Sequence, residues 1–376
     1  MARGGERPQA RLDTGGVPPE SRFEPDPEEL VDPDEVVGLP EGWTVGSPDA
    51  EGADVARLTT LLRDHEREGR GWPGAGREDV LVEVSERGLR TRQNVVVRDE
   101  TGLIRAWGSA HDRAVGRMLL LHVVERGLPE PVGRACSDVV LEWAVGQARE
   151  VGAARGLEVQ QIDTGAFAED ERQHRWLAGS GFERVRTWWQ MSRPVAPEET
   201  SLVPSPAEWS DRGVRFRMVR RRDEDGMPDE EHLRAVHDVL EAAFTDHFNS
   251  KPETFDEFLH RLREDPGHRW DHWWLASLED SGDPVGALVA TVSESTSGPD
   301  GSYVSYIGVV EAARGRGVAK GLLRTVIADA ATRGRDRVTL EVDADSSTGA
   351  DRLYVSMGWK TAYVTESWHR DVPVTP

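Results

Sequence analysis

The chain has 376 residues, 37% of them hydrophobic, and a formal net charge of −22. This length predicts two or three domains, and the charge argues against nucleic acid and anionic membranes as main partners. The single cysteine, Cys136, excludes an internal disulfide and a cysteine-cluster metal site. No apolar run is as long as a membrane span, and the N-terminus lacks the apolar core of a signal peptide. We therefore expect a cytoplasmic protein.

Residues 1–40 are rich in proline, glycine and acidic residues, which is typical of a flexible tail. Residues 41–195 then alternate between strand and helix patterns and are predicted to form a first domain. The expected strands lie near 43–45, 94–98, 103–109, 118–124, 158–162 and 185–191, and the expected helices near 55–62 and 139–148. Residues 196–212 hold three prolines and three serines, which predicts an interdomain linker.

Residues 213–376 repeat this order of elements and are predicted to form a second domain. The expected strands lie near 214–218, 273–276, 285–292, 304–309 and 338–342, and the helices near 233–244, 255–262, 319–330 and 352–358. The two halves can be aligned at their ends, because Arg175–Phe182 matches Arg352–Trp359 in pattern. This indicates an internal duplication of a domain of roughly 150 residues, a period too long for a solenoid repeat.

One stretch of the second half has the pattern of strand, glycine-rich turn and helix. The apolar run Val304–Val309 precedes the turn, and apolar residues recur at helical spacing beyond Ala319. Gly315 and Gly317 allow the backbone to approach a ligand closely. The first turn of a helix has unpaired N–H groups and the positive end of the helix dipole, so this stretch is suited to holding a phosphate or pyrophosphate.

Three ordered segments of the second half resemble a known family. Val309–Ala319, which contains Arg314-x-x-Gly317-x-Ala319, looks like the acetyl-CoA motif of the GNAT N-acetyltransferases. Val342–Ala350 and Leu353–Trp359 resemble later segments of that family. The tandem arrangement is similar to that of mycothiol synthase and related actinobacterial acetyltransferases. The resemblance implies an α/β (α+β) fold of two tandem GNAT-like domains, each a mixed twisted sheet flanked by helices.

The resemblance also implies acetyl-CoA as co-substrate, with no metal. Central strands would splay where the coenzyme enters, and the pantetheine arm would pair with one of them like an added strand. The implied coenzyme-binding residues are Ile307, Gly308 and Val309 for the pantetheine arm, Arg314, Gly315, Arg316, Gly317, Val318 and Ala319 for the pyrophosphate, and Ser347, where the family often has asparagine.

The reaction implied is transfer of an acetyl group to the amine of a small molecule by direct attack. Tyr354 lies where the family places its general acid, and a phenol stays protonated at neutral pH. Without the resemblance, Tyr354 reads as a packing aromatic on an amphipathic helix. Glu294 is the first candidate for the general base, although no motif fixes it. The other candidates are Asp246, His247 and Glu341, and each of the four also fits a solvated surface charge.

The first half departs from the family. Leu177 stands where Tyr354 stands in the second half, and a leucine cannot donate a proton. The region from Val124 to Ala135 lacks the tight glycine turn, and Pro131 removes one N–H group from it. We therefore predict a catalytically inactive first domain that shapes the substrate site or retains weak coenzyme binding.

Other interpretations stay open at this point. A non-catalytic protein that binds acyl-CoA is the main alternative to an enzyme, and the chain could be a monomer or a homodimer. A dinucleotide site at Gly315 and Gly317 is disfavoured because Lys320 occupies the third glycine position. Trp270, Trp273 and Trp274 are read as core residues, with a wall of the substrate site as the alternative.

Overall fold

The computed structural model describes residues 38–49, 52–113, 116–202, 212–224, 226–244, 253–264, 269–293, 295, 298–345 and 349–374. Residues 1–37 of the predicted tail and residues 203–211 of the predicted linker lie outside this range. The same holds for four predicted site residues, namely Asp246, His247, Glu294 and Ser347.

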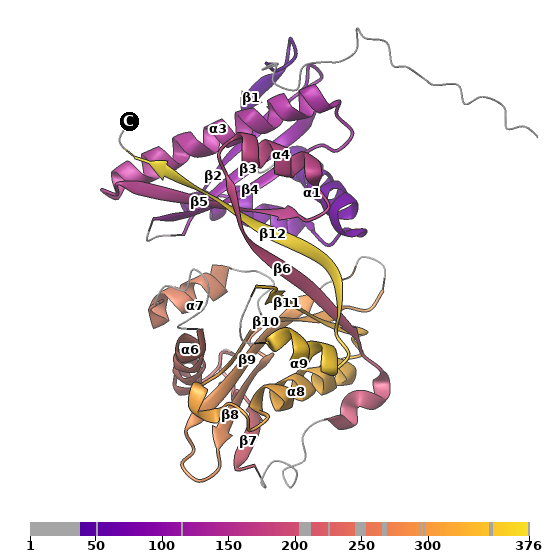
Figure 1. Ribbon diagram of the computed structural model, residues 1–376, viewed down its shortest axis with the longest axis vertical. Coiled ribbons are helices and arrows are strands. Elements are labelled where there is room, and N and C mark those ends of the chain that lie inside the picture. Colours follow the sequence, from indigo (N-terminus) through magenta and orange to yellow (C-terminus); the bar gives the residue numbers. More distant parts are fainter. Residues whose placement is uncertain are drawn as a thin grey trace, which may run out of the picture. The chain divides into compact units, whose positions relative to one another are not determined.

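The N-terminal half begins with a short strand and two helices, and continues through five strands, with a long helix and a shorter one between the last three of them (Figure 1). In α1, Val55, Leu58 and Leu61 are buried at helical spacing, and the helix ends at Gly71, whose φ of 93° is in the left-handed region. The elements are β1 (Thr44–Gly46), α1 (Asp54–Arg70), α2 (Arg77–Val84), η2 (Gly88–Arg90), β2 (Arg92–Arg98), β3 (Ile104–Asp112), β4 (Arg117–Val124), α3 (Glu130–Ala154), β5 (Val159–Phe167), α4 (Glu171–Gly179), β6 (Glu183–Pro194) and η3 (Pro197–Leu202).

The C-terminal half repeats this order, which confirms the duplication and the mixed α/β fold. Its elements are β7 (Val214–Met218), α6 (Glu230–Phe244), α7 (Phe255–Glu264), β8 (Trp273–Leu278), β9 (Pro284–Ser293), β10 (Gly301–Val309), η4 (Glu311–Ala313), α8 (Val318–Thr332), β11 (Arg337–Asp343), α9 (Ala350–Ser356) and β12 (Lys360–Pro373).

The strands of both halves form one sheet in the order β1-β2-β3-β4-β5-β12-β6-β11-β10-β9-β8-β7. The final strands of the two halves have changed places within it. β6 lies against β11 of the C-terminal half, and β12 lies between β5 and β6 (Figure 1). We call this arrangement the strand exchange. It makes the backbone hydrogen bonds of each half depend on the other.

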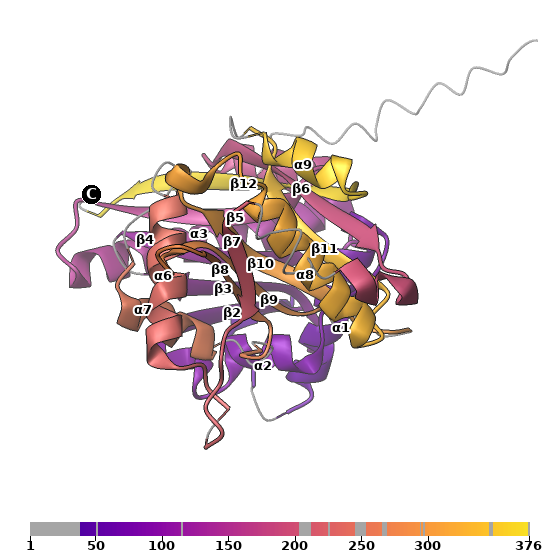
Figure 2. The same cartoon turned by 90° about the horizontal axis from the view of Figure 1, so that it is seen from below.

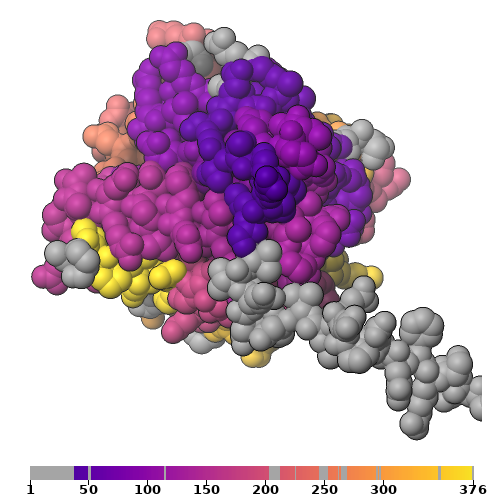
Figure 3. Space-filling model, turned by 90° about the horizontal axis from the view of Figure 1, so that it is seen from above, coloured from indigo at the N-terminus to yellow at the C-terminus, as the bar shows by residue number. Residues whose placement is uncertain are grey.

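The end of β12 also packs on the long helix of the N-terminal half. A Cβ added to Gly152 on α3 would come within 2.4 Å of Val374, so only glycine allows this approach. Figure 3 shows yellow residues of the C-terminal strand at the surface beside magenta residues of the N-terminal half.

Helices cover both faces of the sheet and bury separate apolar clusters. α1 and α2 contribute to one cluster with Trp107, and α6 and α7 contribute to another with Trp273. On the opposite face, α3 packs over β4 and β5, and α8 packs over β10 and β11 (Figure 2). Trp273 and Trp274 are 0% and 2% exposed, which confirms that they are core residues.

β12 is a strand that the sequence pattern does not predict. Polar and apolar residues alternate only weakly in Lys360–Pro373, and only Glu366, Trp368 and Val372 are buried. The strand is held mainly by backbone pairing with β5 and β6 on its two edges. Within the predicted linker, Pro197–Leu202 form η3, and Leu202 packs against the core of the C-terminal half. No helix among the described residues is long and apolar enough to cross a membrane.

The strand exchange predicts that the two halves fold only together. Residues 38–195 expressed alone should be insoluble, because β5 and β6 would each lack β12 and expose a strand edge. Co-expression with residues 196–376 as a second chain should give a soluble one-to-one complex, measured by co-purification and size-exclusion chromatography. A soluble, folded monomer of residues 38–195 would contradict the exchange.

Candidate functional site

Two central strands of the C-terminal half run side by side only at their starts. β10 and β11 are paired from Ser302–Val338 to Val304–Leu340. Beyond this point β10 continues on β9 as far as Val309, and β11 continues on β6 as far as Asp343. A bulge between Val304 and Tyr306 turns β10 away. We call the two inner edges, 305–309 and 341–343, the C-terminal divergence.

The backbone edge of the C-terminal divergence has no strand partner among the described residues. It contains the predicted Ile307, Gly308 and Val309 on the β10 side. Gly308 is required by packing, because an added Cβ would lie 2.8 Å from the Cβ of Ala243 on α6. An extended ligand with amide groups can therefore pair with β10 as an added strand does.

The turn after β10 brings N–H groups together at the start of α8. Gly315 and Gly317 have φ values of 80° and 79°, a conformation that favours glycine. Gly317 is the N-cap of α8, and no side chain caps the helix. The first N–H groups of α8 are thus available to an anion, with the positive end of the helix dipole behind them.

Basic side chains gather on this turn although the chain as a whole is acidic. Arg314, Arg316 and Lys320 are exposed, and none of them forms an ion pair within the described part of the chain. Three unpaired cations beside an uncapped helix N-terminus create a local positive field. This field and the free N–H groups favour a ligand with several phosphate oxygens.

Tyr354 lies on α9 in the same buried cluster as Val318 and Leu322 of α8. Its ring is 6% exposed and packs against Trp359, with 6.1 Å between the ring centroids. Burial raises the pKa of the Tyr354 phenol to about 12. Within the described residues the Tyr354 hydroxyl has no hydrogen-bond partner, so its proton is not committed to another protein group.

Glu341 lies where the C-terminal divergence begins, one residue after the last pair of β10 and β11. Desolvation by the surrounding protein raises the pKa of the Glu341 carboxyl, although the residue as a whole is exposed and the Gln190 hydrogen bond opposes the rise. The Gln190 amide of β6 donates to this carboxylate and, at 3.1 Å, to the Thr365 hydroxyl of β12. The strand exchange thus brings both final strands to the site.

Tyr303 lies near both Glu341 and Tyr363. Burial raises the pKa of Tyr303, and the charge of Glu341 raises it further. Tyr363 on β12 is held by Arg70 of α1, whose Nη1 donates to the Tyr363 hydroxyl at 3.2 Å. The ring of Trp72 packs on the edge of Tyr363 at 5.5 Å. The N-terminal half therefore contributes side chains to the surroundings of this site.

The predicted residues are thus only partly brought together. The described coenzyme-binding candidates lie along the C-terminal divergence and the turn, and Tyr354 lies in the core beneath them. Ser293 pairs with Gly301, at the end of β10 opposite to Val309, and the next residue, Glu294, lies outside the described residues. Gln190 and Tyr363 are not predicted as site residues, because no local sequence pattern indicates the strand exchange.

No cluster of three or more His, Cys, Asp or Glu side chains in the described ranges is arranged to hold a metal ion.

Comparison with known proteins identifies part of the chain. Residues 233–359 match the model of the Acetyltransferase (GNAT) family, so this segment is a GNAT acetyltransferase domain. A mycothiol acetyltransferase from Thermobispora bispora is 34% identical over 188 residues, which are 49% of this chain and 57% of that protein. The chain thus matches little more than half the length of this curated relative.

Solved structures share the fold of most of the chain. A GCN5-related N-acetyltransferase from Sphaerobacter thermophilus has a TM-score of 0.65 at 24% identity, covering 89% of this chain and 97% of that one. A tandem GNAT protein from the clavulanic acid biosynthesis pathway has a TM-score of 0.62 at 13% identity, covering 89% and 99%. At these identities the likeness establishes the fold alone, and it supports the tandem arrangement.

Replacement of Gly317 tests the turn. Gly317→Ala should lower the free energy of unfolding by about 1 kcal/mol, because alanine is strained at positive φ. It should also weaken coenzyme A binding about tenfold by displacing the N–H groups of the turn. Gly334→Ala is the matched control, since Gly334 has a φ of 69° after the other end of α8. Thermal unfolding and calorimetric titration would measure both effects, and equal affinity losses in the two variants would contradict the assignment.

Proposed function

We propose that the GNAT domain of this chain transfers an acetyl group from acetyl-CoA to the amine of a small molecule. The observation that carries the proposal is the C-terminal divergence, which leads directly into an uncapped, positively charged helix N-terminus. A strand edge followed by an anion site matches coenzyme A, whose pantetheine amides are followed by a pyrophosphate.

The coenzyme is proposed to lie along β10. The backbone of Ile307, Gly308 and Val309 would pair with the pantetheine arm. The N–H groups from Arg314 to Ala319 would hold the pyrophosphate, and Arg314, Arg316 and Lys320 would neutralise phosphate charge. Ser347 is proposed to bind the coenzyme as well.

The chemistry follows from attack of the amine on the thioester carbonyl. The new C–N bond forms as the carbonyl oxygen takes up negative charge, which a backbone N–H near Val309 would stabilise. The C–S bond then breaks, and Tyr354 donates its proton to the departing sulfur. The proton lost by the amine nitrogen passes to the base. Proton exchange with water then returns the base to its carboxylate form and the Tyr354 phenolate to its phenol. A pKa of about 12 keeps Tyr354 protonated throughout the physiological range.

Two carboxylates are proposed as alternatives for the base. Glu294 is the candidate from the sequence, and Glu341 is supported by its position at the start of the C-terminal divergence and by its raised pKa. A raised carboxylate pKa makes Glu341 a stronger base once it is ionised.

The acceptor is proposed to be a cationic amine that lies among Tyr303, Tyr363 and Glu341. Tyrosine faces and a carboxylate together suit an ammonium group before it loses its proton. The relative named mycothiol acetyltransferase makes the amine of the mycothiol precursor the first acceptor to assay. Binding of coenzyme A without thiol release on any amine would favour a non-catalytic acyl-CoA-binding protein instead.

Tyr354→Phe tests the general acid. The variant should lower kcat for thiol release by about 10²–10⁴-fold, because the leaving thiolate loses its proton donor. Its Tm and its affinity for coenzyme A should stay unchanged, because the hydroxyl has no partner within the described residues. A spectrophotometric thiol assay and calorimetry would measure these quantities. Full activity in Tyr354→Phe would exclude the acid role.

The paired variants Glu341→Gln and Glu294→Gln distinguish the two bases. If Glu341 is the base, activity should rise with pH through its raised pKa as the carboxyl ionises, and Glu341→Gln should remove that rise and lower kcat. Glu294→Gln should then keep the profile of the parent protein. Rate-against-pH curves for the three proteins measure this, and the opposite pattern would assign the base to Glu294.

A further inference from the structure

The N-terminal half has a strand divergence of its own. β4 and β5 are parallel neighbours from Arg117–Gln161 to Leu120–Thr164. β4 then follows β3 to Val124, and β5 follows β12 to Phe167. The inner edges 121–124 and 165–167 form an N-terminal divergence at the same place in the fold as the C-terminal one.

A glutamine side chain spans this N-terminal divergence. Gln173 is 2% exposed, and its Nε2 lies within hydrogen-bond distance of the carbonyl oxygens of His122 on β4 and Gly165 on β5, at 3.4 Å each, and of His122 Nδ1, at 3.2 Å. One side-chain amide thus reaches both strands where a pantetheine amide would pair. Ser137 fixes the His122 ring through a hydrogen bond of 3.0 Å to Nε2, and Trp176 packs on the edge of this ring.

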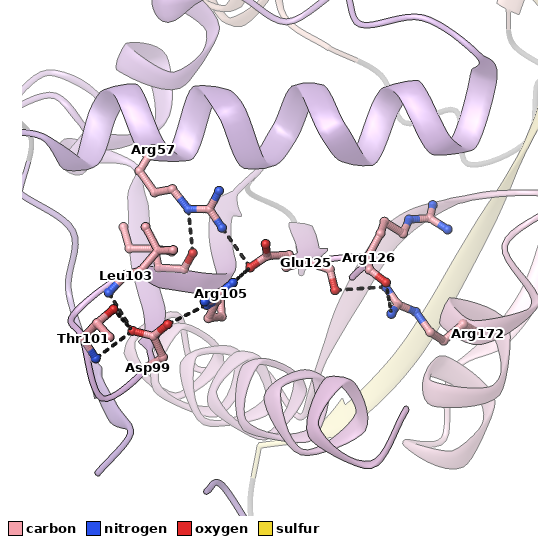
Figure 4. Close-up of polar contacts among 9 residues, drawn as sticks. Arg57, Asp99, Thr101, Leu103, Arg105, Glu125, Arg126 and Arg172 are labelled. Carbon is pink, nitrogen blue, oxygen red and sulfur yellow. Dashed lines mark hydrogen bonds and ion pairs between the residues drawn. The ribbon is translucent and has the colours of Figure 1, made fainter. Parts of the chain in front are cut away.

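The turn after β4 is also occupied. Arg172 donates to the carbonyl oxygens of Arg126 at 3.2 Å and Glu125 at 3.4 Å (Figure 4). This turn therefore presents carbonyl oxygens, where a phosphate site needs N–H groups. The Glu125 carboxylate is paired with Arg57 at 2.9 Å and with Arg105 at 2.7 Å, which fixes the side chain of this turn residue within the fold.

The start of α3 is also unsuited to binding the phosphates of a coenzyme. Pro129 is the N-cap and Pro131 lies in the first turn, so N–H groups are missing where an anion would bind. The first-turn residue Glu130 carries a carboxylate that already occupies the positive end of the helix dipole. Three features, the Gln173 amide, the Arg172 guanidinium and this helix start, thus oppose a coenzyme at the N-terminal divergence.

The C-terminal half has small residues at the corresponding positions. The ends of α4 and α9 have equivalent backbone hydrogen bonds, which supports the alignment of the two halves. Phe182 N donates to Leu177 O at 3.0 Å, and Trp359 N donates to Tyr354 O at 3.1 Å. In this alignment Gln173 corresponds to Ala350, and Arg172 corresponds to Gly349. Neither Ala350 nor Gly349 has a side chain long enough to cross the C-terminal divergence.

We propose that Gln173 and Arg172 close the N-terminal half to coenzyme A, so that each chain binds one coenzyme, in its C-terminal half. The residue at the position shared by Gln173 and Ala350 decides which half is open. The Gln173 amide takes the place of a pantetheine amide within the fold. This inference rests on the proposed use of coenzyme A by the C-terminal half.

Calorimetric titration of the full chain with coenzyme A tests the inference. The parent protein should bind one equivalent. Ala350→Gln should weaken that binding about 100-fold, because the new amide competes for the strand edges. Val355→Gln is the matched control on the same helix, since Val355 is 60% exposed, and it should keep the parent affinity. Thermal unfolding would verify that both variants are folded.

Removal of the two side chains should reopen the N-terminal half. Arg172→Ala/Gln173→Ala in the Ala350→Gln background should regain coenzyme A binding, which native mass spectrometry would detect as one bound coenzyme. The regained affinity should be below that of the parent protein, because Pro129 and Pro131 still remove N–H groups from the start of α3. Two coenzymes on the parent protein, undiminished affinity in Ala350→Gln, or no regained binding in the triple variant would overturn the inference. No coenzyme on the parent protein would instead refute the proposed function.

Discussion

The site depends on the separation of two parallel strands that are each held from outside. β10 is kept in place by β9 as far as Val309, and β11 is kept in place by β6 as far as Asp343. Because each strand satisfies one edge on its outer neighbour, the inner edges can stay unpaired without the sheet coming apart. The free edges invite a ligand that hydrogen-bonds as a strand does. The bulge at Val304 and Tyr306 and the glycine-rich turn then direct that ligand toward the start of α8.

The two halves of the duplication treat the unpaired edges of their separated parallel strands differently. In one half the unpaired edges stay free beside small residues, and in the other one carbonyl oxygen of each edge accepts a hydrogen bond from Gln173. Buried polar backbone groups need partners, and a side-chain amide supplies them as a ligand would. The fully buried His122, whose pKa burial lowers to about 4, stays neutral near pH 7 and fits this closed arrangement.

Local patterns in the sequence predicted most elements and the main motif. The alternation in Val214–Met218 and the helical spacing after Ala319 are local signals, and both elements are present. β12 was missed because both of its neighbours, β5 and β6, belong to the N-terminal half, so no pattern near residues 360–373 indicates this pairing. The roles of Gln190 and Gln173 could not be predicted either, since Gln190 bonds to Thr365 of the other half and Gln173 bonds to His122, 51 residues earlier in the chain. The degenerate turn near Pro131 was visible, but not the side chains that fill the space beside it.

The strand exchange has a consequence for synthesis on the ribosome. β5 and β6 are complete by residue 194, whereas the strand that separates them begins at residue 360. At elongation rates of about 5–20 residues per second, the intervening residues take roughly 10–30 s to translate. During that interval the edge of β5 that β12 later covers has no native partner. The nascent N-terminal half therefore stays incompletely folded, and a chaperone that covers this strand edge would protect it from aggregation. Because β12 is translated last, its insertion into the sheet is the folding step that completes both halves.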